Sequence, residues 1–333
     1  MPPGAILEEP WDLLIHTDAC LEGYGAESCG EAFQGLWGEE HRGKDINQLE
    51  FIAAIRSLDY FTAHLRGVKV RLMVDNKSVE WYIYKMGGTR SLPLMGLALR
   101  FWELALSRDL SVEVDYIPSE ENKAADLLSR KILNPYQVWS LDKGVFQELV
   151  EEVGCPSIDL FASQDNCQVP RYIAWKREQG AVAENAFHYN WDREALAYAF
   201  PRFKLVGKVL DKLRTHQDVT LILIAPVWKT RVWYPILLEM LVDHPILLGM
   251  NQQLILSQNQ EPHPLLELGR LRLAAWKLSS RPEGPRDFQR MLAKSWSNGG
   301  PLAQSRLTRG LGNDGIAGVL NGVTIPFHHL YQS

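Results

Sequence analysis

The sequence predicts an α/β protein with two domains, and three observations lead to this expectation. The chain has 333 residues, which is more than one domain usually contains. Hydrophobic residues make up 46% of the chain, enough to form sizeable cores. Stretches with strand patterning alternate with stretches of helical spacing in both halves. We therefore expect a first domain at residues 10–133, a smaller second α/β domain at 134–265, and a linker or irregular tail at 266–333.

The first half predicts the element order β-β-β-α-β-α-α-β-α. Its clearest element is the helix at 45–67, where apolar side chains fall largely on one face. Asp45 has the chemistry of an N-cap and Gly67 that of a stop signal. The other elements are predicted as a strand and glycine-bearing turn at 11–26, two short strands at 32–43, strands at 68–75 and 110–118, and helices at 76–86, 91–109 and 121–131.

The second half predicts a small parallel sheet, because strands alternate with helices there. The expected strands are 157–163 and 219–228, and the expected helices are 141–154, a loop and helix at 198–216, and 231–244. The pattern weakens after about Leu265. Stretches rich in Gly, Pro, Ser and Arg follow it, which is typical of a linker or tail.

Composition limits the possible partners. A formal net charge of −5 does not indicate a nucleic-acid binder by bulk electrostatics, so any such binding needs a local basic patch. The 4 cysteines form no CxxC pair, which favours free thiols in a reducing compartment over a zinc site. The first ten residues lack the features of a signal peptide, and the apolar run at 219–228 is too short to cross a bilayer. We expect an intracellular protein, cytoplasmic or nuclear, with no membrane partner.

Four carboxylates stand out in the first domain. Asp18 lies in the first strand, Glu50 on the apolar side of the first helix, Asp75 at the end of a strand, and Asp126 in the last short helix. Each alone has an ordinary explanation, as a turn residue or a solvated charge. Four converging acids would repel one another strongly unless cations neutralised them. Mg²⁺ or Mn²⁺ suits such oxygen ligands, and two ions can activate water for phosphodiester hydrolysis.

The stretches around these acids carry a resemblance to a known family. They are "HTDAC…GYGA", "INQLEFIAA", "VRLMVDNKSV" and "YIPSEENKAADLLSR", and together they resemble the four blocks of a retroelement-type ribonuclease H domain from about Trp11 to Lys131. The resemblance implies a mixed five-stranded sheet with helices and the four acids as ligands of two Mg²⁺ or Mn²⁺ ions. It also implies hydrolysis of the RNA strand of an RNA–DNA hybrid, leaving a 3′-hydroxyl. Many members carry a His a few residues before the last Asp, and this chain has none there.

Other polar residues of this domain are candidate nucleic-acid contacts. The stretch "KMGGTRS" contains Lys85, Thr89 and Arg90, which either hold a phosphate backbone or form a glycine turn with solvated charges. Asn76 either bonds a sugar hydroxyl or base edge, or caps the following helix. Asn122 completes the predicted nucleic-acid-binding set.

The second domain carries a weaker resemblance. "KMGGTRS" and "NKAADLLSR" are similar to the tyrosine-recombinase retrotransposons of the DIRS and Ngaro type. In that group a reverse transcriptase precedes the ribonuclease H domain, and a domain similar to Dam-type adenine methyltransferases often follows it. The resemblance implies an upstream reverse transcriptase as a partner in a polyprotein, a Rossmann-like, methyltransferase-type second domain, and a tail leading toward an absent recombinase.

This methyltransferase-type pattern is degenerate. In "FPRF", Phe200 stands where an active enzyme has Asn or Asp, and Arg202 replaces the second proline. Asp159 and Asn166 are candidates to line a vestigial pocket.

The sequence leaves three candidate functions. The first is a metal-dependent, retrotransposon-derived ribonuclease H, and the second is a catalytically idle nucleic-acid-binding remnant. The third is an adenine DNA methyltransferase, which "FPRF" disfavours.

Overall fold

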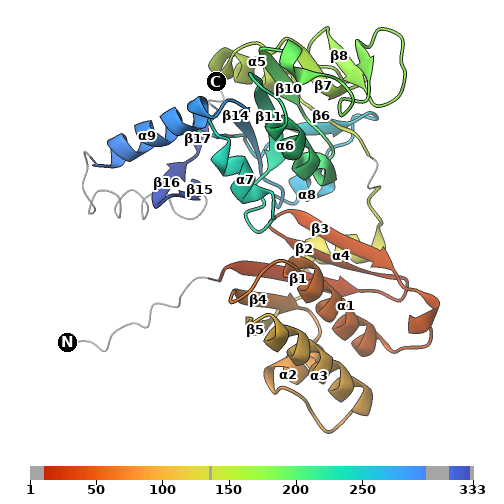
Figure 1. Cartoon of the computed structure of the whole chain (residues 1–333). Helices are drawn as coiled ribbons and strands as arrows, with labels where there is room; N and C mark the ends of the chain where they lie inside the picture. Colours follow the sequence, from red (N-terminus) through yellow and green to blue (C-terminus); the bar gives the residue numbers. More distant parts are fainter. Residues whose placement is uncertain (1–10, 135–136, 298–314, 331–333) are drawn as a thin grey trace. The chain divides into compact units, whose positions relative to one another are not determined.

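A computed structural model describes residues 11–134, 137–297 and 315–330 of the chain (Figure 1). The chain divides into two compact units, Met1–Asn134 and Pro135–Ser333. The second unit is the larger, so the prediction of a smaller second domain is wrong. The reason is that the segment after residue 265 folds as part of this unit. Within the described ranges, no helix combines the length and apolar character needed to cross a membrane.

The first unit contains a mixed five-stranded sheet, as predicted, in the order β3-β2-β1-β4-β5. β1 is antiparallel to β2, and β2 is antiparallel to β3. β1, β4 and β5 are parallel to one another. The strands are β1 (Leu13–Ala19), β2 (Gly23–Ser28), β3 (Glu31–Leu36), β4 (Lys69–Val74) and β5 (Ser111–Tyr116).

The helices of this unit are α1 (Ile46–Phe61), α2 (Lys77–Tyr84), α3 (Leu92–Ser107) and α4 (Lys123–Arg130), with a short 3₁₀ helix, η1 (Glu39–His41). Asp45 caps α1 as predicted, because its carboxylate accepts the backbone N–H of Gln48. α1 ends at Phe61, before the predicted stop at Gly67. Two short strands are predicted at 32–43, but only the first of them, β3, is present. The 3₁₀ helix η1 takes the place of the second.

The second unit is built on an eight-stranded sheet in the order β17-β12-β14-β11-β10-β7-β8-β9. The five strands from β11 to β9 are parallel, as the sequence predicts. β14 runs antiparallel to both of its neighbours, β11 and β12. The strands are β7 (Ile158–Ala162), β8 (Tyr172–Ala174), β9 (Ala183–Glu184), β10 (Leu196–Ala199), β11 (Thr220–Pro226), β12 (Ile246–Leu247), β14 (Leu273–Ser279) and β17 (His328–His329).

Helices and two small strand pairs complete this unit. The pairs are β6 (Trp139–Leu141) with β13 (Ile255–Ser257), and β15 (Ile316–Leu320) with β16 (Val323–Pro326). The helices are α5 (Lys143–Val153), α6 (Val206–Arg214), α7 (Tyr234–Glu239), α8 (Pro264–Glu267) and α9 (Glu283–Ser297), with η2 (Trp191–Arg193) and η3 (Phe203–Leu205). α7 is shorter than the helix predicted at 231–244.

The structure corrects the predicted tail at 266–333. β14 pairs with β11 along its whole length, from Leu273 to Ser279. Trp276 within it is completely buried in the core of the unit. The burial of this apolar strand makes it a central element, although Gly- and Pro-containing stretches flank it in the sequence. Residues 298–314, which belong to one of the Gly- and Ser-rich stretches of the predicted tail, lie outside the described residues.

Candidate metal centre

Three carboxylates of the first unit converge from separate parts of the chain. Asp18 lies on β1, Glu50 on α1, and Asp75 directly after β4. One carboxylate oxygen from each residue lies within 4.8 Å of the other two. β1 and β4 are adjacent parallel strands, so the ends of both strands meet at one edge of the sheet. α1 contributes its acid because Glu50 lies among the buried residues of that helix.

Burial and mutual repulsion both act on these acids. Burial raises the pKa of Asp18 to about 6, and the negative charges of Asp75 and Asp126 add to this effect. Burial raises the pKa of Glu50 to about 9, again with the neighbouring acids adding to it. The pKa of Asp75 is raised by burial as well. Such a cluster is costly when ionised, and a bound divalent cation would offset the cost.

Two serines orient the cluster. The Ser129 hydroxyl, from α4, donates a hydrogen bond to Asp18 Oδ2. The Ser119 hydroxyl donates to Asp75 Oδ2 at 2.9 Å. The other oxygen of Asp75, Oδ1, is buried with no hydrogen-bond partner among the described residues. A buried oxygen without a partner fits a position intended for a cation, because unsatisfied buried acceptors are otherwise costly.

Asp126, the fourth predicted ligand, lies outside the group of three. Arg130, one helical turn later on α4, donates from Nε to Asp126 Oδ1 at 2.6 Å. Both side chains reach solvent. The charge of Asp126 nevertheless raises the pKa of Asp18, Glu50 and Asp75, so it belongs to the same electrostatic centre. Its role as a metal ligand remains a prediction.

Glycines in β2 allow α4 to approach the centre. Gly25 pairs with Asp18 across the antiparallel β1–β2 ladder. A Cβ atom at Gly25 would lie 2.3 Å from the backbone nitrogen of Ser129, a distance that no real contact allows. The motif "GYGA" therefore has a packing explanation: glycine lets α4 lie against β2 and bring Ser129 to Asp18.

The predicted nucleic-acid contacts have different outcomes. Asn76 caps α2, accepting the N–H groups of Ser78 and Val79, and its amide also bonds Asn47. Asn122 is only 1% exposed and donates from its amide to the Thr17 carbonyl, and its contact with a bound strand remains a prediction. The three predicted contacts in the loop between α2 and α3 are exposed: Lys85, Thr89 and Arg90.

Sequence reasoning did not identify Ser119, Ser129 and Arg130 as parts of this centre. Each contacts one of the predicted acids. Arg130 carried a signal, since an arginine four residues after an aspartate on a helix is placed to pair with it. The serines carried none that is specific, because small polar residues occur in every loop and helix end.

The comparisons with known proteins concern the first unit. No protein-family model matches the chain, and neither does any curated protein. The N-terminal RNase H domain of rv2228c from Mycobacterium tuberculosis is 18% identical, covering 36% of this chain and 92% of its own, with a TM-score of 0.31. RNase H1 from Halobacterium salinarum is 20% identical, covering 35% and 92%, with a TM-score of 0.30. LC11-RNase H1, recovered from compost and solved with an RNA/DNA hybrid, is 19% identical, covering 35% and 93%, with a TM-score of 0.31.

The raised pKa values predict a pH-dependent stability in the presence of chelator. The folded pKa values of Asp18 and Glu50, about 6 and about 9, exceed their ordinary values of 3.8 and 4.5. Their contribution is therefore full below about pH 4 and is lost as the pH rises through both folded values. We expect the melting temperature with chelator to fall between pH 5 and pH 9, and Mg²⁺ to restore it at the alkaline end.

Glu50→Gln is the control for this pH dependence. The variant lacks the group that titrates at about 9, so the alkaline part of the decline should be smaller by several degrees. The measurement is thermal unfolding by circular dichroism at each pH, with chelator and with Mg²⁺. Identical pH profiles for the parent and Glu50→Gln would contradict the assignment of Glu50 to the centre.

Proposed function

We propose that the first unit is a metal-dependent endoribonuclease of the ribonuclease H type, which cuts the RNA strand of RNA–DNA hybrids. The observation that carries this proposal is the convergence of the carboxylates of Asp18, Glu50 and Asp75 within 4.8 Å of one another. Further support comes from the mixed five-stranded sheet and from the sequence blocks that resemble the family. Asp18, Glu50 and Asp75 are three of the four acids that this resemblance names as ligands.

The residues present fit divalent metal ions. Asp18, Glu50 and Asp75 would hold them, and Asp126 would complete the set once its carboxylate exchanges the Arg130 contact for the metal. Two Mg²⁺ or Mn²⁺ ions held there would activate a water molecule and stabilise the leaving oxygen. Ser129 and Ser119 keep two of the carboxylates oriented before any metal arrives.

Binding of the hybrid would use cations outside the acidic centre. The net charge of −5 offers no general attraction for a polyanion. Lys85 and Arg90, both exposed in the α2–α3 loop, are the candidates for phosphate contacts. The Lys85 ammonium also lies 4.8 Å from the centre of the Tyr84 ring, which places an exposed aromatic face beside it.

Cleavage of a labelled hybrid tests the proposal. The purified chain is given an RNA–DNA hybrid, an RNA duplex and a DNA duplex, each with Mg²⁺, with Mn²⁺ or with chelator. We expect cutting of the RNA strand of the hybrid alone, giving products with 3′-hydroxyl ends and no cutting with chelator. Cutting of both strands, or cutting that survives the chelator, would contradict the proposal.

The alternative is a catalytically idle remnant that binds nucleic acid. The structural feature in its favour is the Asp126–Arg130 ion pair, which occupies one of the four acids. A remnant would bind the hybrid and cut nothing with either metal.

We also propose that the chain belongs to a retrotransposon polyprotein, downstream of a reverse transcriptase. That context rests on the resemblance of "KMGGTRS" and "NKAADLLSR" alone.

A further inference from the structure

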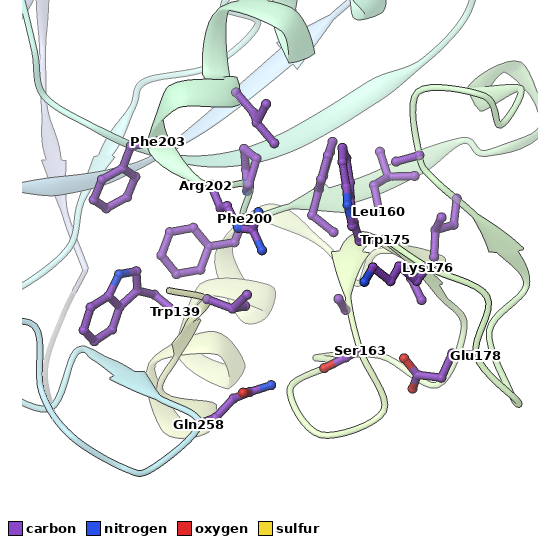
Figure 2. Close-up of a pocket in the computed structure, with 18 of the residues that line it drawn as sticks. Trp139, Leu160, Ser163, Trp175, Lys176, Glu178, Phe200, Arg202, Phe203 and Gln258 are labelled. Carbon is purple, nitrogen blue, oxygen red and sulfur yellow. The ribbon is translucent and has the colours of Figure 1, made fainter. Parts of the chain in front are cut away.

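The second unit contains a cavity of about 380 Å³ that the ribonuclease proposal does not use (Figure 2). Ser163 lines it directly after β7, Trp175 directly after β8, and Phe200 directly after β10. The cavity therefore lies at the carboxyl ends of three parallel strands. Its volume is in the range of small-molecule sites.

The strand order makes this position significant. From β7 the chain proceeds to β8 and β9 on one side, whereas β10 and β11 lie on the other side of β7. The order thus reverses between β7 and β10. In open parallel sheets the connections diverge at such a reversal and leave a crevice outside the carboxyl ends of the strands. The cavity occupies the crevice that the topology creates.

The loop at the end of β7 is held in place by hydrogen bonds to two polar side chains. Asp159 is buried, and its carboxylate accepts the N–H groups of Phe161 and Gln168, both at 3.2 Å. Asn166 accepts the Ser163 N–H at 2.6 Å. Asn166 lines a separate, smaller cavity, and Asp159 is buried and lines neither of the two. The predicted pair therefore supports the loop that carries Ser163 through hydrogen bonds to its backbone.

Aromatic side chains form much of the wall. Phe200, Phe203 and Trp139 lie on one side in Figure 2, with Trp175 across from them. Trp175 lines the cavity and is 51% exposed, so part of its ring is accessible to a ligand. Flat aromatic faces bordering a cavity favour a flat ring, such as a nucleobase, because stacking tolerates any base.

The charges around the cavity are mainly positive. Lys176, Arg177 and Arg202 line it, and Glu178 is the one acid among its lining residues. The Glu178 carboxylate already accepts the Tyr172 hydroxyl at 3.1 Å and the Gln164 N–H at 2.7 Å. An excess of cations beside aromatic walls favours an anionic group on the ligand, and phosphate is the anion that accompanies a nucleobase.

We propose that this cavity binds a nucleotide, with its base against the aromatic walls and its phosphate near Lys176 and Arg202. The two residues that depart from the methyltransferase pattern, Phe200 and Arg202, are among those that make the cavity aromatic and cationic. S-adenosylmethionine carries a sulfonium and an ammonium group, so the cationic rim disfavours it. The nucleotide comes either free from solution or as part of a nucleic-acid strand.

Titration calorimetry of the full chain tests this proposal. The probes are AMP, adenosine, S-adenosylmethionine and a short single-stranded oligo-dA. We expect AMP to bind with a Kd below about 1 mM and adenosine at least about tenfold more weakly, because it lacks the phosphate. Oligo-dA binding tighter than AMP identifies a strand as the source, and AMP binding at least as tightly identifies the free nucleotide.

Variants assign the binding to the cavity. Lys176→Glu and Trp175→Ala change exposed lining residues, and each should weaken AMP and oligo-dA binding at least about tenfold. Lys208→Glu, an exposed change on α6 outside the cavity lining, is the matched control and should leave binding unchanged.

Three results would overturn the proposal: no binding of AMP and oligo-dA, adenosine or S-adenosylmethionine binding as tightly as AMP, or Lys176→Glu binding like the parent. Asp75→Asn should retain full AMP affinity. Failure of the ribonuclease proposal is thereby distinguishable from failure of this one.

Discussion

Asp75→Asn is expected to lower cleavage of the RNA–DNA hybrid by about 1,000-fold or more while leaving the fold intact. The substitution removes a ligand charge and keeps the volume of the side chain. In the parent, one oxygen of Asp75 accepts the Ser119 hydroxyl, and the other is buried with no hydrogen-bond partner in the described structure. The variant has an amide in place of this carboxylate. An amide binds Mg²⁺ far less well than a carboxylate does, so the cation site is lost. The rate is measured on the labelled hybrid at saturating Mg²⁺.

Asp109→Asn is the matched control for this experiment. Asp109 is exposed and has a positive φ of 54°, a conformation that Asn adopts readily. Asp109 precedes the start of β5, and the start of β5 pairs with the start of β4. Asp75 follows the end of β4, so the two aspartates lie at opposite ends of these parallel strands. We expect parental activity from this variant. If Asp75→Asn cut the hybrid as fast as Asp109→Asn, the carboxylate cluster would not be the catalytic centre.

A stability measurement separates lost chemistry from lost folding. In the presence of chelator, Asp75 contributes one of several negative charges that raise the pKa of Asp18 and Glu50. Removal of that charge relieves repulsion, so Asp75→Asn should be at least as stable as the parent at pH 8 without metal. With Mg²⁺ the parent should gain stability and the variant should gain less.

The sequence predicts the first unit well because its local signals agree with its tertiary structure. Alternating patterning marks β4, and helical spacing together with the Asp45 cap marks α1. The second unit is harder to predict because one of its central strands depends on distant pairing. β14 joins the sheet beside β11 through antiparallel contacts, and nothing near Leu273 in the sequence announces a partner some fifty residues earlier.

In the candidate metal centre, too, some residues could be proposed from the sequence and others could not. Asp18, Glu50 and Asp75 could be proposed from the sequence because the blocks around them resemble a known family, although each acid alone has an ordinary explanation. The contact between Ser129 and Asp18 spans most of the first unit and leaves no local trace. The contact of Asn122 is equally long-range, because its amide donates to the Thr17 carbonyl across 105 residues of sequence.

Gly25→Ala is expected to destabilise the first unit by about 1–3 kcal/mol, which is a large effect for a single methyl group. The added Cβ would lie 2.3 Å from Ser129 N, 2.5 Å from the Leu128 carbonyl carbon and 2.6 Å from the Ala125 oxygen. All three atoms belong to the α4 backbone, so no flexible side chain can move aside. α4 must shift, and the Ser129 hydroxyl then loses Asp18. We expect hybrid cleavage to fall together with stability.

Gly96→Ala supplies the comparison that makes this result specific. Gly96 lies in α3, and a Cβ there would meet nothing within 4 Å outside its own helix. Alanine is a better helix former than glycine, so this variant should gain up to about 1 kcal/mol. Urea unfolding of both variants, followed by circular dichroism, measures the difference. Equal midpoints would mean that α4 does not need the close approach at Gly25, and that Ser129 reaches Asp18 without the glycine.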